Sequence, residues 1–227
     1  MDDRALLEGS ELRRRFGKTT ALDGVSLTLE AGEVVAVMGP SGSGKSTLLH
    51  CLAGILPPDD GEVWFNGDRI DELGDGARTK LRRSAFGFVF QLGQLVFELS
   101  LAENVALPLL LGGRDRRSAL AESDGWLERL GVGEVAGHRP GEVSAGQAQR
   151  AAVARALIHG PRVVFADEPT GALDSLAGEQ VMELLVGAAR EQGAAVLLVT
   201  HDVRVAAYAD REVIVRDGRV ANAPVSA

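Results

Sequence analysis

The sequence predicts an α/β protein built on a mostly parallel β-sheet. Three apolar runs lack strict alternation of polar and apolar residues, which indicates strands covered on both faces; they are residues 34–38, 163–166 and 195–199. Helical patterns lie between these runs, at about 45–53 and 145–159 between the first and second, and at about 176–190 between the second and third. This alternation of buried strands and helices is typical of doubly wound α/β architecture.

Other segments indicate antiparallel strands added to that core. Asn66-Gly67 follows an apolar run, and Asp217-Gly218 follows another; both dipeptides are strong hairpin signals. Residues 25, 27 and 29 are apolar and alternate with polar neighbours, as in a strand with one buried face.

Between Gln91 and Val143 the strand signals give way to helical ones. The run 101–111 is opened by Ser100 with Glu103 three residues later, which is a capping-box pattern, and Pro108 is expected to bend or end that helix. We therefore expect a single domain over residues 1–227. Its α/β core would occupy about 1–91 and 144–227, with an inserted helical subdomain at about 92–143 and a short tail at 221–227.

Composition narrows the class of protein. The 227 residues suffice for one sizeable core but hardly for two full domains. The net charge of −8 argues against a nucleic-acid partner, and the one cysteine, Cys51, excludes an intrachain disulfide and fits a packing role in a reducing compartment. No signal pattern and no apolar run of membrane-spanning length is visible. We expect a cytosolic chain whose membrane attachment comes through a partner.

Residues 39–46 fit the pattern G-x-x-x-x-G-K-S between a predicted strand and a predicted helix, which is the context of a phosphate-binding loop. Glycines let backbone N–H groups surround phosphate oxygens, Lys45 reaches the β- and γ-phosphates, and the Ser46 hydroxyl can bind Mg²⁺. The candidate ATP-binding residues here are Gly39, Pro40, Ser41, Gly42, Ser43, Gly44, Lys45, Ser46 and Thr47. The alternative is an ordinary Gly-Ser turn with a surface lysine.

Polar residues also follow the other two buried runs, at the edge where open α/β sheets bind ligands. Asp167 and Glu168 follow the second run; one carboxylate can hold Mg²⁺ and the next can act on an attacking water. His201 follows the third run, where a ring nitrogen can hydrogen-bond a γ-phosphate. A solvated strand end and a structural histidine are the alternatives.

Ser144 and Gln147 form another capping-box pattern at the start of the helix at 145–159. One interpretation is simply a well-started helix, and the other is a helix end that also presents donors to an anion. Asp174 precedes the helix at 176–190 and is a candidate N-cap.

Residues 143–150, together with the loop at 39–46 and the Asp167-Glu168 pair, resemble the signature of the ATP-binding cassette (ABC) family. Two positions depart from that family's Leu-Ser-Gly-Gly-Gln, since Val143 replaces Leu and Ala145 replaces the first Gly. The resemblance implies that the signature residues bind the γ-phosphate of ATP held by a second subunit; these are Ser144, Ala145, Gly146 and Gln147.

The same resemblance assigns roles to the remaining candidates. Asp167 would be a Mg²⁺ ligand, Glu168 the general base and His201 the switch histidine. Gln91, which follows a predicted strand, would contact Mg²⁺ or the attacking water, although it can also be a plain polar cap. Asp174 would lie at the dimer seam. Phe16 would stack on adenine, with a place in the core as its alternative.

The amino-acid sequences at 88–91, 103–108 and 167–171 resemble those of one branch of the family. That branch serves macrolide efflux, lipoprotein release, antimicrobial-peptide resistance and cell division. The resemblance implies an ATPase that dimerises around two ATP molecules and drives an integral membrane permease from the cytoplasmic face. A homodimer is favoured over a heterodimer. The alternatives are a soluble ABC ATPase of DNA repair or translation, and a small-molecule P-loop kinase, which would leave the signature unexplained.

Overall fold

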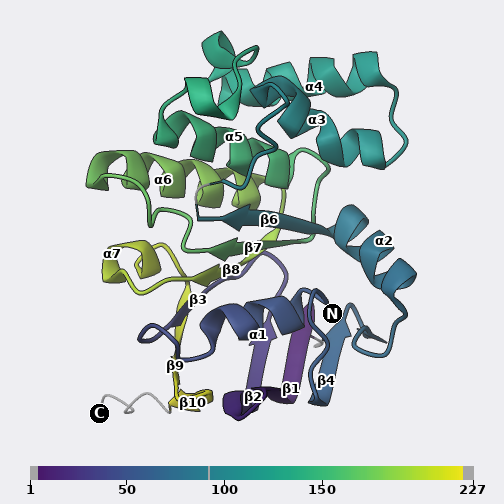
Figure 1. Ribbon diagram of the computed structural model, residues 1–227, viewed down its shortest axis with the longest axis vertical. Coiled ribbons are helices and arrows are strands. Elements are labelled where there is room, and N and C mark those ends of the chain that lie inside the picture. Colours follow the sequence, from purple (N-terminus) through teal and green to yellow (C-terminus); the bar gives the residue numbers. More distant parts are fainter. Residues whose placement is uncertain (1–4, 92, 222–227) are drawn as a thin grey trace. The chain divides into compact units, whose positions relative to one another are not determined.

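The computed structural model describes residues 5–91 and 93–221, which form two compact units (Figure 1). The first unit comprises residues 1–82 and 195–227, and the second comprises residues 83–194. Both contain strands and helices, so the predicted α/β class is confirmed. The predicted boundaries of the helical subdomain, 92 and 143, stay a prediction.

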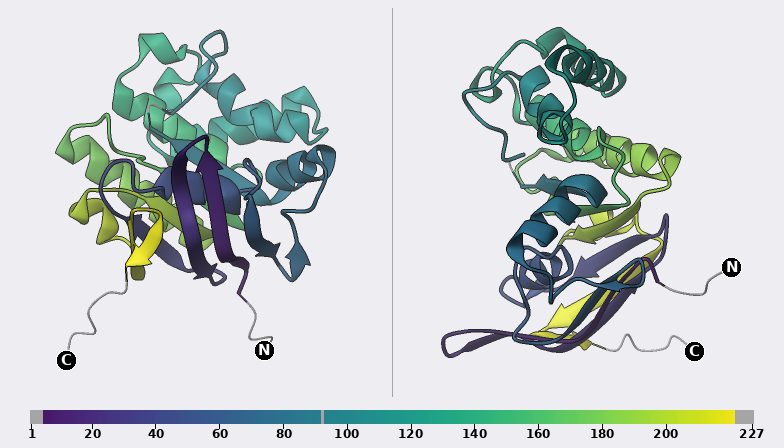
Figure 2. Two further views of the ribbon diagram at one scale, coloured as in Figure 1. Left: turned by 60° about the horizontal axis from the view of Figure 1, so that its bottom comes forward. Right: turned by 90° about the vertical axis from the view of Figure 1, so that its right-hand side faces the viewer.

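An antiparallel sheet in the first unit has the strand order β2-β1-β4-β5 (Figure 2). Its strands are β1 (Leu7–Phe16), β2 (Thr19–Leu29), β4 (Asp60–Phe65) and β5 (Asp68–Arg69). Residues 25, 27 and 29 of β2 are all buried, as their alternation predicts. Asn66 adopts a left-handed backbone with φ of 53° in the turn between β4 and β5, which confirms the first hairpin.

The other strands of the first unit follow the order β10-β9-β3-β8. They are β3 (Val34–Met38), β8 (Ala195–Val199), β9 (Arg211–Arg216) and β10 (Arg219–Ala221). Strand β3 runs parallel to both β8 and β9, and β10 returns antiparallel to β9. Asp217, with φ of 48°, makes the second predicted hairpin turn. The two predicted buried runs of this unit are thus confirmed as neighbouring parallel strands.

Two helices of the first unit follow strands directly: α1 (Lys45–Leu52) after β3 and α7 (Val203–Ala206) after β8. Helix α1 buries Leu48, Leu49 and Leu52 together with Cys51. Burial raises the pKa of the Cys51 thiol to about 12, because a thiolate loses its hydration there. The packing role predicted for Cys51 is confirmed.

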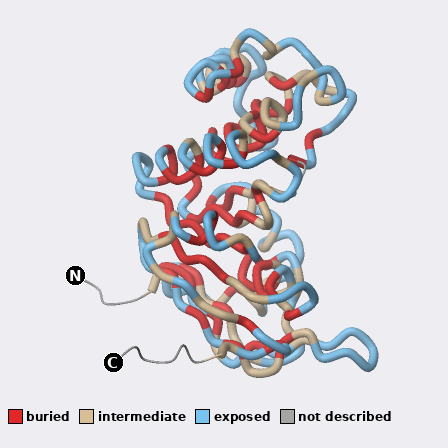
Figure 3. Tube along the Cα trace, turned by 90° about the vertical axis from the view of Figure 1, so that its left-hand side faces the viewer, coloured by how far each residue is buried: buried red, intermediate tan, exposed pale blue. Residues whose placement is uncertain are grey.

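The second unit contains the parallel pair β6 (Phe86–Phe90) and β7 (Val163–Asp167). Helix α5 (Ala145–Leu157) packs against β6 and against three other helices, α3 (Leu101–Leu111), α4 (Arg116–Arg129) and α6 (Ser175–Glu191). Short 3₁₀ turns η1 (Gly133–Val135) and η2 (Pro140–Glu142) lie between α4 and α5, and α2 (Asp75–Ala85) runs across the division between the units. Buried positions follow the strands and one face of the helices (Figure 3).

Helix α3 begins under the predicted Ser100–Glu103 capping box but does not end at Pro108; it runs on to Leu111 because only the one hydrogen bond from the missing Pro108 N–H is lost. The predicted tail at 221–227 lies, after Ala221, outside the described residues.

Candidate functional site

The loop 39–46, here called the phosphate loop, connects β3 to α1 within the first unit. It passes so close to its neighbours that side chains would not fit: a Cβ on Gly39 would lie 2.0 Å from the Val215 carbonyl oxygen, and one on Gly44 would lie 2.2 Å from that of Ala21. Both glycines also have positive φ, 148° and 103°. Glycine is therefore required at these positions by both space and backbone conformation.

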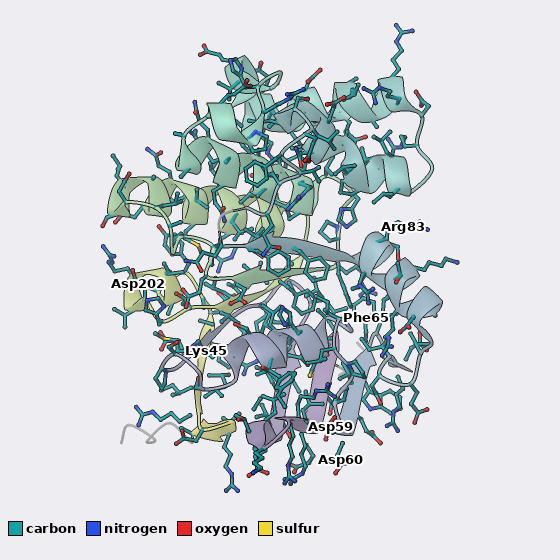
Figure 4. The ribbon with its side chains drawn as sticks, in the orientation of Figure 1. Lys45, Asp59, Asp60, Phe65, Arg83 and Asp202 are labelled. Atoms are coloured by element: carbon teal, nitrogen blue, oxygen red, sulfur yellow. The ribbon has the colours of Figure 1, made fainter. Side chains whose placement is uncertain are left out.

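Lys45 lies at the start of α1 (Figure 4) and is buried. Its ammonium donates to the carbonyl oxygens of Gly39 and Pro40, at 2.8 and 2.9 Å. The N-cap, Gly44, offers no side-chain acceptor, and the first turn of α1 carries no acidic residue. A buried cation and uncapped N–H groups at one helix end form an electropositive site suited to phosphate.

Two hydroxyl groups of the phosphate loop, those of Ser43 and Ser46, also suit a phosphate ligand and its Mg²⁺. Among the described residues, the buried Ser43 hydroxyl has no hydrogen-bond partner, which leaves one donor available for an anion. Ser46 is exposed in the first turn of α1, so its oxygen is accessible as a ligand of Mg²⁺.

His201 lies just after β8, whose neighbour β3 leads into the phosphate loop. The Thr200 N–H donates to the Val37 carbonyl oxygen at 3.1 Å, which holds this strand end beside the end of β3. His201 is exposed, and Asp202 caps α7 (Figure 4). Hydrogen bonds from Arg204 lower the pKa of Asp202. The first unit therefore brings His201 and the phosphate loop to the same edge of the sheet.

Phe16 ends β1 and is 50% exposed, with the Arg14 guanidinium 5.2 Å from its ring centre. Its alternative assignment to the core is therefore wrong. Stacking on adenine stays a prediction.

In the second unit, Asp167 ends β7 directly opposite Phe90 in β6. This register brings Gln91 next to the segment that begins at Glu168, and a Cβ on Gly171 would lie 2.9 Å from the Gln91 side-chain nitrogen. Glu168 has a left-handed backbone, with φ of 46°, a conformation that is unfavourable for most residues and is concentrated at functional sites. The amide of Gln91 and the acidic pair are thus neighbours.

The signature segment 144–147 begins α5 and forms a complete capping box. The Gln147 N–H donates to the Ser144 hydroxyl at 3.2 Å, and the Ser144 N–H donates to the Gln147 side-chain oxygen at 2.9 Å. Ala145 is in the first turn with a negative φ. Asp174 caps α6 by accepting from the Ala177 N–H at 2.9 Å, so the capping interpretation is confirmed at both helices.

Ser144, Gly146 and Asp174 also line one common hollow of about 200 Å³. Because Ser144, Ala145 and Asp174 are exposed, capping does not prevent these helix ends from meeting a ligand or a second chain.

The oxygen donors proposed for Mg²⁺ are the Ser46 hydroxyl, the Asp167 carboxylate and the Gln91 amide. Hard oxygen donors are what Mg²⁺ prefers, and it is usually held by one or two carboxylates with phosphate and water rather than by a protein cage. Among the described residues no group of three or more His, Cys, Asp or Glu side chains forms such a cage. Each of the three groups is thus of the chemical type that binds Mg²⁺, and their joint role as ligands stays a prediction.

Sequence patterns did not predict two polar residues of α5 that hydrogen-bond the chain on either side of Gln91. Buried Gln149 donates to the Phe90 carbonyl oxygen before Gln91, and half-buried Arg155 donates to the carbonyl oxygens of Gly93 and Gln94 after it. The signal that points to them is a polar residue on the otherwise apolar, alanine-rich face of α5. Burial lowers the pKa of Arg155.

Comparison with known proteins agrees over most of the chain. The sequence model of the ABC transporter family matches residues 22–171. The lipoprotein-releasing system ATP-binding protein LolD of Granulibacter bethesdensis is 46% identical over 217 residues, which are 94% of each chain. The macrolide export ATP-binding/permease protein MacB of Marinobacter nauticus is 42% identical over 97% of this chain but only 35% of its own length.

A solved structure is similarly close. The dimeric ATP-binding cassette MJ0796, in a post-hydrolysis state with ADP and Pi, superposes with a TM-score of 0.87 at 38% identity, covering 94% of this chain and 96% of that one. Fold and sequence therefore point to the same family.

Proposed function

The chain belongs to the ABC transporter family, and we propose that it is an ATPase subunit that dimerises around two ATP molecules and drives a separate membrane permease. The observation that carries this proposal is the phosphate loop, in which Lys45 and the uncapped start of α1 form an anion site. Dimerisation and hydrolysis of ATP are supported by a relative, the dimeric cassette MJ0796 in a post-hydrolysis state with ADP and Pi.

We assign nucleotide binding to residues 39–47. When ATP enters, the Lys45 ammonium exchanges its two carbonyl partners for β- and γ-phosphate oxygens, and backbone N–H groups of the loop bind the same phosphates. Phe16 stacks on the adenine, which its exposure allows. Mg²⁺, held by Ser46, Asp167 and Gln91, would neutralise the developing phosphate charge.

For hydrolysis we assign the proton transfer to Glu168. Its carboxylate accepts a proton from the attacking water, Gln91 orients that water, and His201 hydrogen-bonds the γ-phosphate. The left-handed backbone at Glu168 supports this assignment, since such a conformation fixes the direction of the side chain at an energetic cost.

The signature segment completes the reaction from a second subunit. We propose that Ser144, Ala145, Gly146 and Gln147 bind the γ-phosphate of ATP held by the partner cassette, with Asp174 at the seam. Their exposure around one hollow supports this role. A homodimer is the simplest assembly, because each copy would supply both half-sites.

The partner that uses this work would be an integral membrane permease, with the cassette on the cytoplasmic face. Among the described residues no helix has both the length and the apolar character to cross a bilayer. The LolD relative is named as the ATP-binding protein of a lipoprotein-releasing system, which supports a permease supplied by another chain. A role in DNA repair or translation is not favoured, because these relatives act in lipoprotein release and macrolide export.

Glu168→Gln tests the chemistry. We expect kcat to fall by about 10²- to 10⁴-fold, the usual contribution of a general base, while ATP binding persists and ATP-bound dimers accumulate. Steady-state ATPase kinetics and gel filtration with ATP measure both effects. Glu183→Gln, an exposed change on α6, is the control and should keep wild-type turnover; an unchanged kcat in Glu168→Gln would refute the base assignment.

The assembly is tested by mass spectrometry of the intact complex extracted from membranes. We expect two copies of this chain with an integral membrane protein. Reproducible isolation with ribosomes or DNA instead would refute the transport proposal.

A further inference from the structure

The segment 93–99, which lies between Gln91 and α3, has little regular structure but is held by polar side chains of two helices. From α3, Asn104 accepts from the Val96 N–H at 2.7 Å and donates to the carbonyl oxygens of Val96 and Leu99 at 2.9 and 3.2 Å. From α5, Arg155 donates to the carbonyl oxygens of Gly93 and Gln94 at 2.7 and 2.9 Å. Each end of the segment therefore has its own helix as an anchor.

Arg155 is an unusual anchor. Among the residues that the structure describes, no carboxylate pairs with its guanidinium, and burial lowers its pKa. Burying a charge is costly unless hydrogen bonds compensate for the lost water, and here two consecutive carbonyls do so. Arg155 is half-buried, so hydrogen bonds to one turn of backbone replace part of the hydration of this cation.

The backbone of that turn has an uncommon conformation. Gly93 and Gln94 both have left-handed conformations, with φ of 67° and 45°. The second is unfavourable for a residue with a side chain and persists only when the surroundings impose it. A Cβ on Gly93 would lie 3.3 Å from the Ala152 Cβ of α5, so the turn also packs directly on this helix.

A second contact lies on the other side of Gln91. The Gln149 side-chain nitrogen donates to the Phe90 carbonyl oxygen at 3.1 Å, and Gln149 is buried. Gln149 and Arg155 are six residues apart on α5, about 9 Å along the helix axis. The same helix, α5, which begins with the signature segment, thus hydrogen-bonds the chain both before and after Gln91.

We propose that Arg155, assisted by Gln149, is a positioning residue that fixes the location of Gln91 relative to α5, the helix that begins with the signature segment. The inference rests on the proposed function, in which Gln91 orients the attacking water and 144–147 binds the partner's nucleotide. Engagement of the signature by the second subunit is then transmitted through α5 to Gln91. Arg155 itself does not touch the substrate.

The first test measures the segment directly, without nucleotide. In Arg155→Met, hydrogen exchange at the Gly93 amide should be at least about tenfold faster, because its turn loses both anchoring bonds. Exchange at Val96, which Asn104 holds, should stay unchanged. Unchanged exchange at Gly93 would overturn the inference by itself.

The second test is a double-mutant cycle in kcat with full-length protein. Arg155→Met should lower kcat about 10- to 100-fold with the ATP dissociation constant unchanged, because a small misplacement of a catalytic group has this effect. In the Gln91→Ala background it should cost less than about twofold, the limit of additivity. Arg155→Lys should recover part of kcat, since its ammonium can still bind one carbonyl.

The control is Arg82→Met, which removes a guanidinium that donates to the Gly54 carbonyl at 2.6 Å, outside this segment. It should leave kcat unchanged. Equal losses for Arg155→Met in both backgrounds would overturn the positioning role while leaving the proposed function intact. A Gln91→Ala protein with normal kcat would overturn the positioning role and also the role proposed for Gln91. If Arg155→Met does not fold, the cycle is run with Arg155→Lys, and the same criteria apply.

Discussion

Two helix ends that are both assigned to phosphate binding are built in opposite ways. Helix α1 begins at Lys45 under Gly44, which is left-handed and provides no side-chain acceptor. Helix α5 begins at Ala145 under the complete Ser144–Gln147 capping box. Helices α3, α4 and α6 also begin under a side-chain acceptor, so α1 is the exception among these helices.

The two helix starts differ in whether a side chain of the protein accepts a hydrogen bond from a backbone N–H group of the first turn. The first N–H groups of any helix need acceptors. In α5 the chain supplies one acceptor, the Ser144 hydroxyl, for the Gln147 N–H, which stabilises the start of the signature helix before any nucleotide arrives. In α1 the first N–H groups are left for an anion, and the loop is kept open by glycines packed against backbone rather than by caps. Four substitutions test this contrast, beginning with the largest effect.

Gly39→Ala should be the most damaging change. Its Cβ would lie 2.0 Å from the Val215 carbonyl oxygen, and steric overlap together with positive φ should cost about 3 kcal/mol or more of unfolding free energy. Gly42→Ala is the matched control, because Gly42 has positive φ but no atom within 4 Å of its Cβ. It should lose about 1–2 kcal/mol. Equal losses in urea unfolding would contradict the packing argument.

Lys45→Ala should lower ATP affinity about 10- to 100-fold, the worth of a charged hydrogen bond of about 1.5–3 kcal/mol. Isothermal titration measures it. Lys80→Ala, an exposed lysine of α2, is the control and should bind ATP normally. Normal ATP affinity in Lys45→Ala would count against the phosphate loop.

Ser144→Ala should destabilise the protein by about 1 kcal/mol, because it removes an N-cap, and should also lower ATPase activity. Asp115→Ala, which removes the N-cap of α4, should cost similar stability but leave turnover alone. If both variants kept wild-type turnover, Ser144 would be a cap and nothing more.

Ala145→Gly should have the smallest effect. Ala145 has a helical, negative φ, so glycine should cost about 1 kcal/mol of stability and change ATPase activity little. An increase above about tenfold, or 1.4 kcal/mol of barrier, would instead mark the natural segment as degenerate and in need of an unlike partner cassette.

Short-range patterns predicted the elements well, because each depends on a few adjacent residues. The Asn66-Gly67 and Asp217-Gly218 turns, the Ser100 and Ser144 capping boxes and the buried strands all appear as expected. Phe16 was undecided because exposure depends on the whole fold.

Long-range contacts were not predictable in this way. The carbonyls bound by Arg155 are 61 and 62 residues away in sequence, and no local pattern encodes such a pairing. The left-handed Glu168 backbone likewise follows from the turn that the chain must make after β7 rather than from the identity of the residue. The chemical roles of the site residues stay predictions that the substitutions above test.

The phosphate loop also depends on the far end of the chain. The Gly218 N–H donates to the Ser43 carbonyl oxygen at 3.0 Å, and Val215 lies against Gly39. A ribosome therefore finishes the loop's residues long before it makes the hairpin of β9 and β10 that supports them. During synthesis the phosphate loop must wait for β9 and β10, so the nascent protein should acquire tight ATP binding only after residue 218 has emerged.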